Sequence, residues 1–285
     1  MLYWLRAKQM LDALWSEREV PAFLYDWLVH LINASQDSAG DRLRLLMIRL
    51  AHIKATYRTA ELANNELYRM ATILEHELLN FERDELKGNP TLSCRVTDTS
   101  SAQHSWKAIR HDYASVHGFL YWTHWRMCWI MLSRLQLALR RQAAVYMQIY
   151  AQMHDPGAES DAARSRQDAV DDICASVLYA LPRGPNKEPP PGSLSMASTL
   201  LLPLMVAGTH CIEQLSDPML TADGRRVVFV AEALHRDESN ATSAQLAYII
   251  DKVDYIANEI DLRRAAEVGS FLKGERRVYY DLGRS

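Results

Sequence analysis

Four side chains that could do chemistry recur along one face of a helical stretch between residues 117 and 128. His117, Tyr121, His124 and Cys128 follow one another at helical spacing, which places them along a single stripe of an α-helix. Imidazole and phenol groups exchange protons and hydrogen bonds with ligands. We therefore expect His124, His117 and Tyr121 to be the catalytic groups of a binding site.

A second stripe of the same stretch is aromatic. Trp122, Trp125 and Trp129 are three of the seven tryptophans of the chain, and such rings could line an apolar cavity with a few polar contacts. The alternative is that the rings are ordinary core, which is typical of an aromatic stripe at helical spacing. The expected substrate pocket consists of Trp122, Trp125, Trp129, Cys128, Met205 and His210.

The same stripe carries side chains that could bind a metal ion, but their spacing does not suit one. His117, His124 and Cys128 are suitable donors for zinc, but they span several helical turns, too far to meet one ion. Glu75-His76-Glu77 lacks the second histidine that the zinc-protease motif requires. We expect no metal in the protein.

One acidic cluster, DAVDD, places Asp168 beside both Asp171 and Asp172 on a helix. Paired carboxylates could hold magnesium for a diphosphate substrate, but the order of the acids differs from the aspartate-rich motif of terpene cyclases. We expect an acidic first helical turn, stabilised by the helix dipole. The chain also has no phosphate-binding glycine loop and no G-x-S-x-G elbow, so we expect no cofactor.

The composition sets limits on the function. The chain has 285 residues, 48% of them hydrophobic, and a formal net charge of -3, which gives no electrostatic attraction for nucleic acid. Its four cysteines are scattered, as reduced intracellular thiols are. The N-terminus lacks a signal-peptide core, and we expect no run long and apolar enough to span a bilayer. We predict an intracellular, cytoplasmic protein that binds no nucleic acid and no membrane, and that could form a homodimer.

Hydrophobic periodicity predicts an all-α fold: one large multi-helix bundle over residues 1–285 around the central aromatic-rich helix. Loops are expected at about 88–104, 154–166 and 182–195, where Ser, Thr, Gly and Pro accumulate. Pro203 predicts a kink or break in the apolar run that contains it. The predicted helices cover about residues 2–15, 21–32, 41–58, 59–87, 116–148, 167–181, 194–215, 223–234 and 242–272.

Three runs resemble a known family. THWRMCWIMLSRLQLAL, DDICASVLYALP, and LLLPLMVAGTHC followed by GRRVVFVAEALHR are similar, in order and spacing, to successive blocks of the regulatory domain of fungal zinc-cluster transcription factors. The resemblance spans about residues 60–265 and implies a helical domain, often in regulators of secondary metabolism, that senses a small molecule. The chain lacks the six-cysteine zinc cluster and its adjoining basic segment, so the resemblance does not extend to reading DNA.

Two functions remain. The first is a cofactor-independent enzyme of fungal secondary metabolism that cyclises or isomerises an apolar intermediate, as in an intramolecular cycloaddition, because proximity and one hydrogen bond suffice for such a reaction. The alternative is a transcriptional regulator or co-regulator in the nucleus, with a ligand-sensing domain that acts through partner proteins. The chain begins with Met and its first helical segments fit the bundle, so we expect a stand-alone protein and favour the enzyme. In both cases the expected partner is an apolar small molecule.

Overall fold

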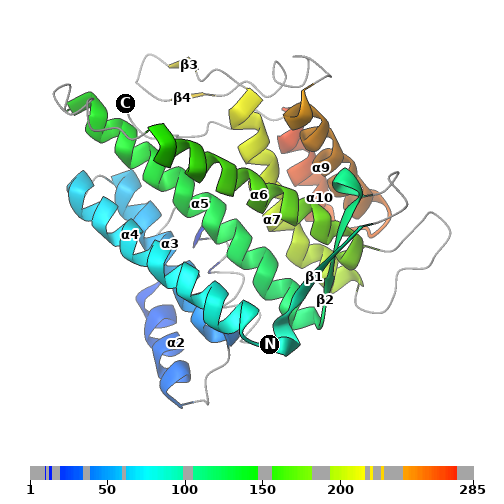
Figure 1. The fold of residues 1–285 in the computed structure, drawn as a ribbon, viewed down its shortest axis with the longest axis horizontal. Helices are drawn as coiled ribbons and strands as arrows, with labels where there is room; N and C mark the ends of the chain where they lie inside the picture. The colour runs from blue at the N-terminus through cyan, green and yellow to red at the C-terminus, as the bar shows by residue number, and fades with distance from the viewer. Residues whose placement is uncertain are drawn as a thin grey trace. The chain divides into compact units, whose positions relative to one another are not determined.

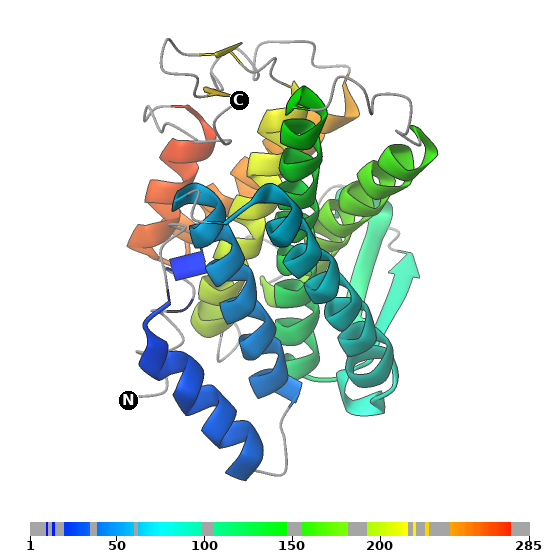
Figure 2. The same cartoon turned by 90° about the vertical axis from the view of Figure 1, so that its left-hand side faces the viewer.

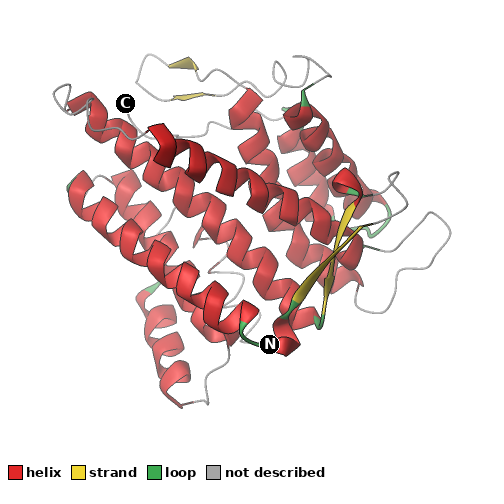
Figure 3. Ribbon diagram, in the orientation of Figure 1, coloured by secondary structure: helices red, strands yellow, loops and turns green. Residues whose placement is uncertain are grey.

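The computed structural model is built almost entirely from helices, which confirms the predicted all-α, multi-helix fold (Figures 1 and 3). It describes residues 10, 13–14, 20–34, 39–59, 62–98, 105–146, 156–181, 193–215, 219–220, 226–227 and 240–274. The α-helices in this part of the chain are α2 (Ala22–Ala34), α3 (Ala39–Thr59), α4 (Asn64–Phe81), α5 (Val116–Tyr146), α6 (Pro156–Ala180), α7 (Ser193–Leu215), α9 (Ala241–Asn258) and α10 (Arg263–Leu272).

Two short antiparallel hairpins accompany the helices. Strand β1 (Cys94–Asp98) pairs with β2 (Ile109–Tyr113), so that Cys94 lies opposite Tyr113 and Val96 opposite His111. Strands β3 (Met219–Leu220) and β4 (Arg226–Val227) form the second hairpin. The β1–β2 hairpin brings polar side chains into contact with the helices.

The chain divides into two compact units. Unit 1 comprises residues 1–90 and 131–160, and unit 2 comprises residues 91–130 and 161–285. Helix α5 therefore contributes its first half to unit 2 and its second half to unit 1. Whether residues 1–285 act as a single domain stays a prediction.

Unit 1 is built on the contact between α3 and α4, which lie alongside each other in Figure 2, with α2 packed on α3. Helix α4 buries Leu67, Leu74 and Leu78, which recur at helical spacing on one face. The second half of α5 contacts α4 through polar side chains. Gln136 Nε2 donates to Glu75 Oε2 at 2.8 Å, and the Arg140 guanidinium lies over the Tyr68 ring. A six-residue π-helix, Glu82–Lys87, continues α4.

Unit 2 has a core of α7, α9 and α10, which pack against one another. Helix α7 runs unbroken through Pro203, so the predicted break is wrong. Its residues 194–215 are long and apolar enough to cross a membrane, by length and composition only, which contradicts our expectation that no such run exists. Because 72% of that stretch is buried within the fold, it also has the character of the core helix of a soluble protein, and the absence of membrane binding stays a prediction.

The helix predictions are confirmed for most of the described chain, but several boundaries are wrong. Helix α6 begins at Pro156, so the predicted loop over 154–166 is largely helix, because proline is well suited to the first turn. Residues 94–98 of the predicted loop 88–104 are strand β1. Residues 182–192 of the third loop lie outside the described part of the chain.

Two predicted helices near the C-terminus also differ from the structure. The helix expected over 242–272 is interrupted after Asn258, where Asp261 takes a left-handed φ of 55° before α10 begins. That conformation cannot continue a right-handed helix. Residues 226–227 of the helix expected over 223–234 are strand β4, and residues 228–239 lie outside the described part, as does most of the predicted first helix.

The start of α5 is fixed by a glycine. A Cβ on Gly118 would lie 3.0 Å from the backbone oxygen of Leu92, whereas a Cβ on Gly208 of α7 would meet the flexible end of the Leu272 side chain at 2.7 Å. We expect Gly118→Ala to lower the free energy of unfolding by about 1–3 kcal/mol, the usual range for overpacking, and Gly208→Ala to cost less because leucine can change rotamer. Urea unfolding of both variants tests this, and the reverse order would contradict it.

Candidate functional site: a buried polar network in unit 2

Helix α6 presents polar groups on two of its faces. Ser165, Asp172 and Ser176 recur at spacings of seven and four and contact α5, as residues on one helical stripe do. Asp171 lies one position before Asp172, about 100° around the helix, and contacts Gln245 of α9. Two adjacent carboxylates thus bind two different sets of partners.

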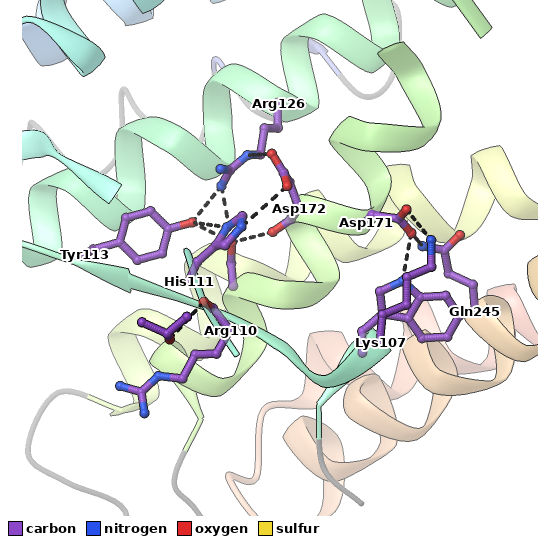
Figure 4. A network of polar contacts seen from close by, with 11 residues as sticks. Lys107, Arg110, His111, Tyr113, Arg126, Asp171, Asp172 and Gln245 are labelled. Atoms are coloured by element: carbon purple, nitrogen blue, oxygen red, sulfur yellow. Dashed lines mark hydrogen bonds and ion pairs between the residues drawn. The ribbon is translucent and has the colours of Figure 1, made fainter. Parts of the chain in front are cut away.

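Arg126 is the centre of the contacts between α5 and α6 (Figure 4). Its Nε donates to Asp172 Oδ2 at 3.1 Å, and its Nη1 donates to the Tyr113 hydroxyl at 2.6 Å. Its guanidinium carbon lies 5.0 Å from the centre of the Trp122 ring, within the range of a cation–π interaction. The guanidinium is therefore held by an ion pair, a hydroxyl and an aromatic face together.

Strand β2 brings two further groups to the same place. His111 and Tyr113 alternate with Asp112 along the strand and so point to the same side, toward Arg126 and Asp172 in Figure 4. His111 Nε2 lies 3.4 Å from Asp172 Oδ1, and the Tyr113 hydroxyl lies 2.6 Å from Ser176 Oγ. Ser176 in turn donates to the backbone carbonyl of Asp172, so the contacts form one continuous network.

Arg126 carries its charge in a nearly dry environment, because only 3% of its side chain is exposed, against 44% for Asp172. Burial opposes the charged guanidinium, but Tyr113 and Asp172 outweigh it and raise the pKa of Arg126. Burial also raises the pKa of the Asp172 carboxyl, although the Arg126 guanidinium opposes the rise. The pair thus joins a fixed buried cation to a carboxylate that reaches solvent.

His111 is a neutral ring at physiological pH. Burial, with the Arg126 charge adding to it, lowers its pKa from 6.5 to about 3. Its contact with Asp172 is therefore made by a neutral imidazole rather than by an ion pair. A base with so low a pKa cannot take up a proton near pH 7.

We expect His111 to make the protein acid-sensitive. Unfolded His111 binds a proton below about pH 6.5, whereas the folded form does so only near pH 3, so acidification favours the unfolded state across that window. Between about pH 8 and pH 5 this costs about 2 kcal/mol of unfolding free energy. Urea titrations at several pH values should show a flatter profile for His111→Phe, which cannot titrate. A variant with an unchanged pH slope would contradict the assignment.

Asp171 holds a second cluster. Its Oδ1 accepts from Trp106 Nε1 and from Gln245 Nε2, both at 2.7 Å, and its Oδ2 accepts from Lys107 Nζ at 2.6 Å. The Trp106 ring also lies 5.7 Å from the ring of Tyr248 on α9. Asp171 therefore ties the segment before β2 to both α6 and α9 (Figure 4).

Three cysteines of this unit, Cys94, Cys174 and Cys211, have raised pKa values. Burial raises the pKa of the Cys174 thiol well above its ordinary value and that of Cys211 to about 12, and both contact the Gln245 amide. Cys94 is half-buried, and burial raises its pKa too, although Arg126 opposes the rise. Such thiols remain protonated and act as small buried groups.

The three residues predicted to be catalytic lie on the less buried side of α5. His117 is exposed, whereas Tyr121 and His124 are half-buried. The rings of His117 and Tyr121 contact each other, with centroids 6.0 Å apart. A catalytic role for these side chains stays a prediction.

The tryptophans predicted to form a pocket wall pack against one another. Trp125 meets the Trp122 ring edge to face at 5.9 Å and stacks on Trp129 at 5.6 Å. The indole N–H of Trp122 donates to the Leu92 carbonyl and that of Trp129 to Ser165 Oγ. The other predicted pocket residues, Cys128 on α5 and Met205 and His210 on α7, are buried. That these side chains enclose a common cavity stays a prediction.

The acidic cluster has a different position and role from those predicted. DAVDD lies in the middle of α6, which begins at Pro156, so its carboxylates do not occupy a first helical turn. Asp171 and Asp172 instead accept hydrogen bonds and ion pairs from Trp106, Lys107 and Arg126. Among the described residues, no three His, Cys, Asp or Glu side chains are grouped so that they could hold a metal ion.

The comparisons with known proteins add no family to this description. No family model matches the chain, and neither a curated protein nor a solved structure matches it. The resemblance to the regulatory domain of fungal transcription factors therefore remains an expectation from the sequence.

The network is suited to fixing a conformation rather than to acting on a substrate. Arg126, His111 and Ser176 are all buried, and their polar atoms contact other side chains of the network. Buried polar networks with internal partners make one arrangement of the packed elements much more favourable than others. The site is thus a structural junction of α5, α6 and β2, in which the charged partner of Arg126, Asp172, reaches solvent.

Proposed function

We propose that this chain is a regulatory helical protein that senses an apolar small molecule and acts through partner proteins, rather than an enzyme. The observation that supports the proposal is the burial of the network around Arg126. Its histidine is neutral near pH 7, with a pKa of about 3, and its serine is buried beside Tyr113. General acid–base catalysis needs a group that titrates near the working pH and reaches the substrate.

The resemblance of three helical blocks to the regulatory domain of fungal zinc-cluster transcription factors favours the same function. The two blocks that carry the network belong to this resemblance: Arg126 lies in THWRMCWIMLSRLQLAL, and Asp171 and Asp172 lie in DDICASVLYALP. A regulator of this kind would act in the nucleus through partner proteins.

The cofactor-independent cyclase or isomerase is the second candidate. One observation favours it: His117 is exposed and Tyr121 and His124 are half-buried on one stripe of α5, where an imidazole could reach a bound molecule. The stacked tryptophans favour it less, because two of their three indole N–H groups donate within the protein. An enzyme would need those rings to border a space for the substrate.

One incubation distinguishes the two candidates. The protein is mixed with an extract of apolar fungal metabolites, the retained compounds are recovered by ultrafiltration, and mass spectrometry with chromatography compares them with the input. A regulator is expected to retain a compound that leaves chemically unchanged and that raises the melting temperature. An enzyme would instead accumulate an isomer of unchanged mass in several equivalents per chain.

A double variant serves as the matched control. His117→Ala with His124→Ala removes both predicted catalytic imidazoles and leaves the side chains of the network around Arg126 in place. If an isomer accumulates with the native protein and not with this variant, the regulatory proposal is wrong and the enzyme is supported. Retention of the same unchanged compound by both proteins supports the regulator.

A further inference from the structure

Strand β2 and the residues just before it contact two neighbouring carboxylates of α6. Before the strand, Trp106 and Lys107 donate to Asp171 at 2.7 and 2.6 Å. Within the strand, the His111 ring lies 3.4 Å from Asp172. Figure 4 shows the strand passing across α6 between these two anchor points. Both attachments depend on side chains and neither is covalent.

The backbone between the anchors is strained. Lys107 has φ 53° and Ala108 has φ 57°, so two successive residues with a Cβ adopt the left-handed conformation that only glycine adopts readily. Such a conformation persists only where surrounding contacts impose it. The contacts of Trp106 and Lys107 with Asp171 act on this segment, together with the packing of the Trp106 ring on Tyr248.

The hairpin has little sheet to hold it in place. In the described part of the chain, β1 pairs with β2 and with no further strand. Val96 of β1 is 62% exposed although it lies opposite the buried His111. An isolated two-stranded hairpin is only marginally stable in water, so its closed position depends on the contacts that β2 makes with α5 and α6.

The closed hairpin covers a buried cation. Tyr113 of β2 accepts from Arg126 Nη1 at 2.6 Å, and the Arg126 side chain is almost fully buried. Moving β2 away would take the tyrosine hydroxyl and the His111 ring from this side of the guanidinium. Asp172 and Ser176 on α6 and the Trp122 ring on α5 would remain as its partners.

We infer that the β1–β2 hairpin is a lid of unit 2 that opens as one piece from α5 and α6. Asp171 and Asp172 hold the lid closed, and the strained backbone at Lys107 and Ala108, just before β2, favours opening. The lid covers Arg126 when it is closed. This property goes beyond the proposed regulatory function and does not depend on it.

Hydrogen exchange of the full chain, followed by mass spectrometry of peptides, tests the lid. Asp171→Asn removes the charge that Trp106 and Lys107 contact, so peptides covering 94–98 and 109–113 are expected to exchange about ten to a hundred times faster. Peptides of α7 and α10 should keep their native rates, because local opening does not expose them. Lys107→Met removes the half-exposed ion pair with Asp171 but keeps the hydrogen bond of Trp106. It should give a smaller acceleration and serves if Asp171→Asn does not fold.

Relief of the backbone strain is expected to slow hydrogen exchange of the hairpin rather than accelerate it. Ala108→Gly removes the Cβ at φ 57°, so the closed hairpin should become more favourable and the two strands should exchange about fivefold more slowly. Asp251→Asn is the matched control, because it removes an exposed carboxylate of the same unit that pairs with Lys252 and should leave the hairpin unchanged.

Two results would overturn the inference. If Asp171→Asn accelerates α7 and α10 as much as the hairpin, the segment does not open locally. If β2 exchanges faster in Asp171→Asn while β1 does not, the two strands do not open together. If exchange in Ala108→Gly is not slower than in the native protein, backbone strain does not favour opening.

Discussion

An Arg126→Met variant is expected to lose about 1–3 kcal/mol of unfolding free energy, the usual cost of leaving buried polar partners without their hydrogen bonds, since the Asp172 carboxylate that it leaves unpaired is 44% exposed. Methionine fills much of the same space but leaves Asp172 without its cation and the Tyr113 hydroxyl without its donor. It also removes the cation that lies over the Trp122 ring. Urea unfolding monitored by circular dichroism measures the loss.

Arg164→Met is the matched control for this prediction. Arg164 lies on α6 in the same unit and pairs with Asp161 at 3.4 Å, but 71% of its side chain is exposed. Exposed pairs of this kind contribute about 0–1 kcal/mol, so this variant should remain close to the native protein. Equal losses for the two variants would show that the network around Arg126 does not stabilise the fold.

A double variant tests whether the unpaired Asp172 carboxylate contributes to the loss of unfolding free energy. In Arg126→Met with Asp172→Leu, both charged partners are replaced by apolar groups, which often restores stability because no charge is left without its partner. The double variant is expected to be more stable than Arg126→Met alone. A strictly additive result would mean that Asp172, with its exposed side chain, is solvated well enough without Arg126.

Helical periodicity predicted the helices because each of them buries one face within its own unit. Helix α5 begins at Val116, as predicted, and runs to the end of the described stretch at Tyr146. The β1–β2 hairpin was missed for a physical reason. Its strands have five residues each, and β1 alternates polar and apolar residues with Val96 exposed, so neither a long apolar run nor a clear buried face was present to indicate it.

Part of the network had a signal in the sequence. Arg126 lies between Trp122 and Trp129 in an aromatic-rich helix, and a charged side chain in such a position needs a counter-ion. The partner could not be inferred, because Asp172 is 46 residues away and meets Arg126 only through the packing of α6 on α5. Because α6 was predicted to start too late in the chain, Asp171 and Asp172 were assigned to a helix terminus. Their role as partners in the network was therefore not predicted.

The stacked tryptophans give the last prediction. We expect Trp125→Ala to lower the free energy of unfolding by about 3–5 kcal/mol, as truncation of a buried tryptophan does. Trp125 is 8% exposed and contacts the rings of both Trp122 and Trp129. The measurement is urea unfolding together with retention of the compound recovered from the metabolite extract.

Trp129→Ala is the comparison that separates core from pocket. Trp129 is half-buried and bonds to Ser165, so a core role predicts a smaller loss of stability than for Trp125 and unchanged ligand retention in both variants. A wall of a binding cavity predicts the converse: modest losses of stability, because one side of each ring then lacks protein contacts, and loss of ligand retention. Because each ring packs on the next, the two losses should also be non-additive in the double variant if the stack belongs to the core.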